Sequence, residues 1–93
     1  MTLARAADPI LKDRVFQALK CGSFASSKHL VDVSDGPCGD IHLVVISRMF
    51  DRMNYKQRHE IVREELELAL TQEELSEISL CVVVSPEIVK SIF

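Results

Sequence analysis

The segment from 55 to 70 constrains the fold of this 93-residue chain more than any other part. At about 100° per residue its apolar residues fall in one narrow sector and its charged residues on the opposite side, which predicts a helix with one buried face. That sector holds Tyr55, Val62, Leu66 and Ala69. Apolar, largely β-branched runs at 41–47 and 78–84 flank the helix. A helix between two strands is a crossover, so we expect parallel strands and a right-handed connection.

Capping and turn residues indicate the elements before that helix. Asp8-Pro9 is typical of a helix start. Gly22 is expected to end this first helix as a left-handed cap. The segment 29–33 alternates as a half-buried strand does, and the glycines, proline and aspartates of 34–40 predict a long hairpin loop.

Capping residues and apolar runs also indicate the elements in the second half of the chain. Asn54 with Gln57 predicts a capping box for the long helix, and a second capping box at 71–74 predicts a short helix through 76. The strand at 78–84 is nearly uninterrupted in apolar residues, so we expect both of its faces to be covered. Ser85-Pro86 is typical of the start of a last helix.

The order of elements defines the fold class. It is α-β-β-α-(short α)-β-α, an α/β (α+β) chain in which the first two strands are antiparallel. The prediction is a three-stranded mixed sheet packed against helices. We expect one domain over 1–93, with 1–7 flexible.

Composition restricts the class of function. Lys plus Arg is 11 and Asp plus Glu is 14, and the resulting net charge of −3 argues against a general binder of nucleic acid or anionic membranes. No segment resembles a secretory signal, and no run reaches the roughly 18 apolar residues that span a bilayer. Three cysteines cannot all pair, so the chain is expected to be reduced and intracellular. A chain this short rarely holds a deep cleft, so we do not expect an enzyme.

Two residues stand out as candidate ligands. Cys38 lies in the Gly-Pro-Asp loop, where a thiol is either an incidental exposed group or a soft ligand for an iron–sulfur cluster, zinc or copper(I). His59 falls at the edge of the apolar sector of the long helix, where it is either structural or able to face a partner.

The other candidates have simpler interpretations. Cys21 and Cys81 are read as small hydrophobic residues. His29 and His42 are expected to be surface or structural histidines. Arg58 is either an ion-pair residue or a partner contact, and the sequence does not choose between these.

Several runs between 30 and 84 are typical of one family. They are Leu30-Val31-Asp32-Val33-Ser34-Asp35-Gly36-Pro37-Cys38-Gly39, Val44-Val45-Ile46-Ser47 with Phe50, Gln57-Arg58-His59 with Ile61-Val62, Glu73-Glu74-Leu75 with Ile78 and Leu80, and Ser85-Pro86. On these residues the chain resembles the BolA-like family over nearly its whole length. The resemblance implies a fold similar to a class II KH domain.

The resemblance also implies a function. BolA-like proteins pair with monothiol glutaredoxins as heterodimers and share a bridging 2Fe-2S cluster, so the chain would act in cluster assembly, trafficking or iron regulation. The implied ligands are Cys38 and His59 on one side, with two thiolates from glutaredoxin and glutathione on the other. The isolated protein would hold no cluster. A loop cysteine resembles the cytosolic branch, which implies the cytoplasm, with the nucleus as a second compartment and the mitochondrion disfavoured.

Three features depart from the family pattern. Many members have Phe-x-Gly before the long helix, whereas this chain has Phe50-Asp51-Arg52. Without the glycine, the turn is expected to avoid a positive φ at Arg52. Many members also carry a histidine where Ser79 stands. The loop around Cys38 is about one residue out of register with some members.

Two other functions compete with the adaptor. A KH-like nucleic-acid-binding or transcription-regulating module would use a GxxG loop beside a basic patch, and the net charge ranks this second. A zinc or copper chaperone using Cys38 and His59 ranks third.

Overall fold

The computed structural model describes residues 8–92. The expected flexibility of 1–7 lies outside these residues. The elements are α1 (Pro9–Lys20), β1 (Leu30–Asp35), β2 (Ile41–Ile46), the 3-10 turn η1 (Arg48–Phe50), α2 (Tyr55–Ala69), α3 (Gln72–Ser76), β3 (Ile78–Val84) and α4 (Pro86–Ile92). The predicted order of helices and strands is confirmed.

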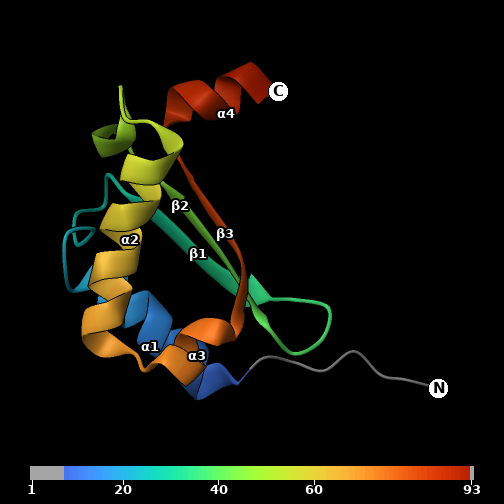
Figure 1. Cartoon of the computed structure of the whole chain (residues 1–93). Coiled ribbons are helices and arrows are strands. Elements are labelled where there is room, and N and C mark those ends of the chain that lie inside the picture. Colours follow the sequence, from blue (N-terminus) through green and yellow to red (C-terminus); the bar gives the residue numbers. More distant parts are fainter. Residues whose placement is uncertain (1–7, 93) are drawn as a thin grey trace.

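The three strands form one mixed sheet in the order β1-β2-β3. β1 and β2 are antiparallel, and β2 and β3 are parallel, as the crossover through α2 predicts. The register between β2 and β3 shifts at Ile41/His42, beside Ser79. Figure 1 shows α2 running back along the sheet, so that it begins near the end of β3 and ends near its start.

The core lies between the sheet and the helices α1 and α2. It consists of Leu11, Val15, Leu19, Phe24, Ile41, Leu43, Val45, Phe50, Val62, Leu66, Leu70 and Val83. The buried residues of β2 alternate with half-buried ones, as expected for a strand with one covered face. The expectation that β3 is covered on both faces is wrong, because Leu80 is 46% exposed on the face away from the core. The valines of β3 reflect strand propensity as much as burial.

The apolar sector predicted for α2 is only partly buried. Val62 and Leu66 are buried, but Tyr55 is 68% exposed and Ala69 is also exposed. These two residues are the first and the last of the helix. Leu70, just past the end of α2, is buried instead.

Gly22 does not act as the left-handed cap that its position suggests. The C-cap of α1 is Cys21 with φ −94°, and Gly22 is not in the positive-φ region. A Cβ on Gly22 would lie 2.7 Å from a carboxylate oxygen of Glu65. This glycine therefore leaves room for the Glu65 carboxylate, which accepts the Ser23 N–H.

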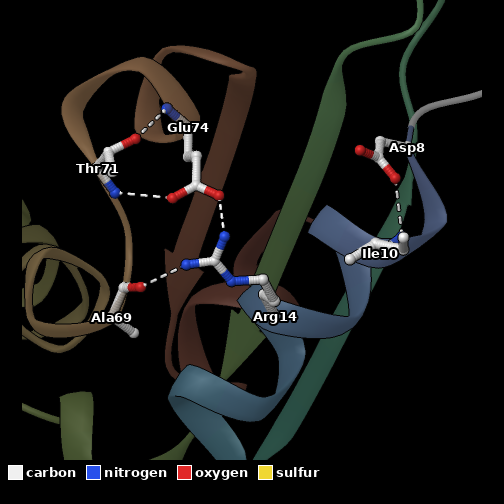
Figure 2. A network of polar contacts seen from close by, with 6 residues as sticks. All are labelled: Asp8, Ile10, Arg14, Ala69, Thr71 and Glu74. Atoms are coloured by element: carbon white, nitrogen blue, oxygen red, sulfur yellow. Dashed lines mark hydrogen bonds and ion pairs between the residues drawn. The ribbon is translucent and has the colours of Figure 1, made fainter.

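Caps and one arginine bring the helix ends together. Asp8 caps α1 through Ile10 N–H, and the predicted capping box of Thr71 and Glu74 is present (Figure 2). Arg14 of α1 bonds Glu74 and also donates to the carbonyl of Ala69 at 2.9 Å. The Thr71 N–H, and then the Arg14 charge, lower the pKa of the Glu74 carboxyl. Arg14 thus joins α1 to the α2–α3 connection.

Arg52 contradicts the expected turn geometry. Its φ is +67°, so the turn before α2 uses the left-handed region even without a glycine. The chain must reverse within the few residues between η1 and α2. A non-glycine residue in this region costs about 1–2 kcal/mol.

Replacement of Arg52 by glycine is therefore expected to stabilise the protein. Glycine removes the steric cost but loses more backbone entropy on folding, so the net gain is about 0.5–1 kcal/mol, or several degrees in Tm. Thermal denaturation followed by circular dichroism measures this gain. The matched control is Asp51→Gly, where φ is −56° and glycine should lower Tm. Equal losses in both variants would contradict strain at Arg52.

Candidate functional site

Cys38 lies in the turn between β1 and β2, and the side chain of Asp40 holds this turn. The Cys38 N–H donates to Asp40 Oδ1 at 2.9 Å, and the Ser79 hydroxyl bonds Asp40 Oδ2. Gly36 N–H closes the turn on the Asp40 carbonyl at 2.8 Å. Gly39 has φ +79°, a conformation that favours glycine. The turn thus presents an exposed thiol on a backbone that is tied to β3.

The environment of Asp40 favours its carboxylate form. The Ser79 hydroxyl and the Cys38 N–H, in that order, lower the pKa of the Asp40 carboxyl. His42 adds a smaller effect, with Nε2 3.9 Å from Asp40 Oδ2. The residues Cys38, Asp40, His42 and Ser79 therefore form one cluster, which we call the hairpin cluster.

His59 lies on α2 and is half-buried, as its position at the edge of the apolar sector predicts. Its ring stacks on Tyr55 with centroids 4.0 Å apart. Burial, and then the neighbouring Arg58 charge, lower the pKa of His59 below its usual 6.5. The imidazole is therefore neutral at pH 7, which is the form that binds metals.

His59 lines a groove of about 520 Å³ between α2, α3 and β3. Leu75, Ile78 and Cys81 line the same groove. Cys81 is half-buried, and burial raises the pKa of its thiol to about 11. This agrees with the interpretation of Cys81 as a packing residue. The same interpretation of Cys21 is wrong, because Cys21 is exposed and its thiol bonds the Gln17 side chain.

The structure does not bring Cys38 and His59 together. Asp40 ties Cys38 to Ser79 at the start of β3, whereas Arg58, next to His59, donates to the Val83 carbonyl near its end. His59 lines the groove between α2, α3 and β3, whereas Cys38 belongs to the hairpin cluster, and no described contact links the two residues.

The remaining candidates have structural partners. His29 Nδ1 forms a hydrogen bond with the hydroxyl of the buried Ser47, and the His29 ring contacts the Phe24 ring edge-on. These contacts confirm that His29 is a structural histidine. Arg58 donates to the carbonyls of Met53 and Val83 at 2.9 and 2.8 Å. The Arg58 guanidinium is thus hydrogen-bonded within the protein, where it links the start of α2 to β3.

Asp40 and Ser79 were missed as partners of the Cys38 turn. The signal available in the sequence was the alternation of Asp40 and His42 around a buried isoleucine, which puts both polar residues on the same side of a strand. The contact with Ser79 depends on the β2–β3 register shift, which no local pattern predicts.

Comparison of the chain with protein-family models and with curated proteins finds no match. The resemblance to the BolA-like family therefore stays a prediction. Within residues 8–92, no helix is long and apolar enough to cross a membrane.

The three thiols should differ in reactivity. Cys21 and Cys38 are exposed, whereas Cys81, with a pKa of about 11, has about one thiolate per thousand at pH 8. Timed alkylation at pH 8 with mass spectrometry should show two fast sites and one that reacts at least ten times more slowly. Cys81 labelling as fast as Cys21 would contradict the burial of its thiol.

Proposed function

We propose that this protein is a BolA-like adaptor that pairs with a monothiol glutaredoxin and shares a bridging 2Fe-2S cluster with it. The observation that carries the proposal is the exposed Cys38 thiol on a turn held by Asp40. The confirmed order of elements and the mixed sheet are compatible with the fold that the family resemblance implies. The protein supplies binding and positioning rather than catalysis.

The donors available fit a shared site better than a site made by this chain alone. Among residues 8–92, no group of three or more His, Cys, Asp or Glu side chains is arranged to hold a metal ion. A thiolate and an imidazole from this chain, with two thiolates from glutaredoxin and glutathione, would complete four ligands. A mixed-ligand cluster of this kind is labile, and an imidazole ligand raises its potential. Cys38 would bind as the thiolate, with its proton lost to solvent.

Anaerobic co-expression with a monothiol glutaredoxin tests the proposal. We expect a brown heterodimer that contains iron and sulfide in equal amounts. Cys38→Ser should remove most of the cluster from the complex. Cys21→Ser is the matched control, because Cys21 is also exposed but lies at the end of α1.

Three results would count against the adaptor. Absence of a complex would exclude the glutaredoxin partnership. Iron and sulfide contents that are equal in Cys38→Ser and Cys21→Ser would exclude Cys38 as a ligand. Zinc or copper in place of iron in the purified complex would favour a metal chaperone.

The nucleic-acid alternative gains no support from the hairpin. Gly36-Pro37-Cys38-Gly39 has the GxxG spacing that a KH-like module would use. However, the turn joins two antiparallel strands, contains no Lys or Arg and is flanked by Asp35 and Asp40. Binding to a single-stranded oligonucleotide with a strong salt dependence would revive this alternative.

A further inference from the structure

We propose that the free edge of β3, with the groove beside it, binds an extended peptide segment of a partner protein, which adds a fourth strand to the three-stranded sheet. The segment has alternating aliphatic side chains and one acidic residue. The inference goes beyond the adaptor function and does not depend on a cluster or on glutaredoxin, since it rests on backbone groups and groove residues of the free protein.

The backbone of β3 has hydrogen-bonding groups that face away from β2. β3 is an edge strand, because the strand order is β1-β2-β3. The Val84 carbonyl faces β2, since it accepts the Ser47 N–H at 3.1 Å. Backbone groups of successive residues in a strand point to opposite sides, so those of Val83 and Cys81 point to the free edge. Arg58 occupies the Val83 carbonyl, and no contact described for residues 8–92 uses the Val83 N–H or the Cys81 N–H and carbonyl on this edge.

The two edges of the sheet differ in their protection against pairing. β1 carries Asp32 and Asp35, and charged residues on an edge strand oppose the addition of another strand. β3 has no charged residue and no proline along its whole length. An apolar edge strand of this kind is a ready template for a strand of another chain. The β3 edge is therefore suited to an interaction that the β1 edge disfavours.

A groove of about 520 Å³ lies beside β3, between this strand and the helices α2 and α3. Its lining is mostly apolar and includes Val62, Leu66, Leu75, Ile78 and Cys81. When a peptide adds to a sheet edge, main-chain hydrogen bonds give affinity, and pockets for alternate side chains give specificity. The groove provides such a pocket for the aliphatic side chains on one face of the added segment.

A second folded copy of this chain does not supply such a segment. The core-facing side chain of Val83 on its β3 is buried in its own core, so it is not available to enter a groove on another molecule. An extended segment with no helix packed against it keeps the side chains of both faces available. The occupant is therefore an extended or loop segment of a different protein.

The charge of the groove selects an acidic segment. Among the described residues that line the groove, Arg63 is the only charged one, given the neutral His59. The Arg63 Nε donates to Glu67 at 2.7 Å, and no described contact uses the two terminal guanidinium nitrogens. A carboxylate of the segment would pair with these nitrogens, whereas a lysine would be repelled.

The test adds synthetic peptides of about eight residues to the free ¹⁵N-labelled protein, followed by nuclear magnetic resonance. The first peptide alternates valine with threonine and carries one glutamate, and the second has lysine in place of the glutamate. We expect the first to shift the amide signals of Cys81 and Val83 and to slow the exchange of these amides by about tenfold near saturation. The lysine peptide should bind about fivefold more weakly, the upper end for an exposed ion pair.

Two further comparisons separate strand addition from general adhesion. In one pair of peptides the N-methyl groups are on all valine or on all threonine nitrogens, and only one of the pair should lose binding, because only one set of donors faces β3. Arg63→Glu should exchange the preference between the glutamate and lysine peptides. Lys56→Ala, on the exposed face of the same helix, is the matched control and should leave both affinities unchanged.

The proposal is overturned if none of the peptides binds, if both N-methylated peptides bind as well as the parent, or if the signal changes lie on β1. A free protein that is already dimeric, with the Cys81 amide protected from exchange, also overturns it, because a second copy then covers the edge. A preference that Arg63→Glu leaves unchanged overturns the acidic residue of the segment. None of these measurements contains glutaredoxin or a cluster, so failure here and failure of the adaptor function are distinguishable.

Discussion

Phe50→Ala is expected to lower the free energy of unfolding by about 3–5 kcal/mol. The Phe50 side chain is fully buried in η1, and its ring lies 5.7 Å from that of Phe24, which is also fully buried. Alanine would leave a cavity where these two aromatic rings meet, and the surrounding chain would close it only in part. Since a domain of this size has a total stability of about 5–15 kcal/mol, the variant should be close to unfolding at 37 °C.

Urea denaturation followed by circular dichroism measures this loss. Phe16→Ala is the matched control, because Phe16 is the same residue type on α1 but only half-buried. The control should lose clearly less stability than Phe50→Ala. Equal shifts of the urea midpoint in the two variants would mean that the contact between Phe24 and Phe50 does not dominate this part of the core.

The sequence predicted the elements with strong periodicity or clear caps. The crossover helix, its capping box at Asn54 and the parallel pairing of 41–47 with 78–84 all follow from local patterns. Buried residues outside those elements were not predicted. Phe24 lies in the segment that connects α1 and β1, and its N–H bonds the Leu19 carbonyl at the end of α1. Phe24 has only Ala25 as an apolar neighbour in a serine-rich segment, so there is no periodicity from which its burial could be predicted.

The candidate site shows the same limit. The exposed Cys38 could be expected from its loop, and the half-buried His59 from the geometry of its helix. Whether the two residues meet depends on how α2 lies against β3, and that is set by tertiary contacts such as Arg58 to Val83. Sequence patterns rank candidate ligands by type and exposure, but the distance between them is a property of the whole fold.

Arg58→Ala is expected to destabilise the protein by about 2–4 kcal/mol, because two carbonyls lose charge-assisted hydrogen bonds in a half-buried environment. The guanidinium donates through Nε to Val83 and through a terminal nitrogen to Met53, and it lies 5.9 Å from the Tyr55 ring. These contacts hold the start of α2 to the end of β3.

Arg58→Lys separates the effect of the guanidinium geometry on stability from the effect of its positive charge. The lysine ammonium group donates from one nitrogen atom, so it cannot reach both carbonyls as the planar guanidinium does. Lysine should therefore recover less than half of the lost stability. Urea denaturation of both variants, beside Lys56→Ala on the exposed face of α2, measures the effect; the control should change stability by less than about 0.5 kcal/mol. If lysine restores full stability, charge alone accounts for the role of Arg58. If instead both variants are as stable as the unsubstituted protein, the guanidinium is free to serve a partner, and the alternative interpretation of Arg58 as a contact residue becomes the stronger one.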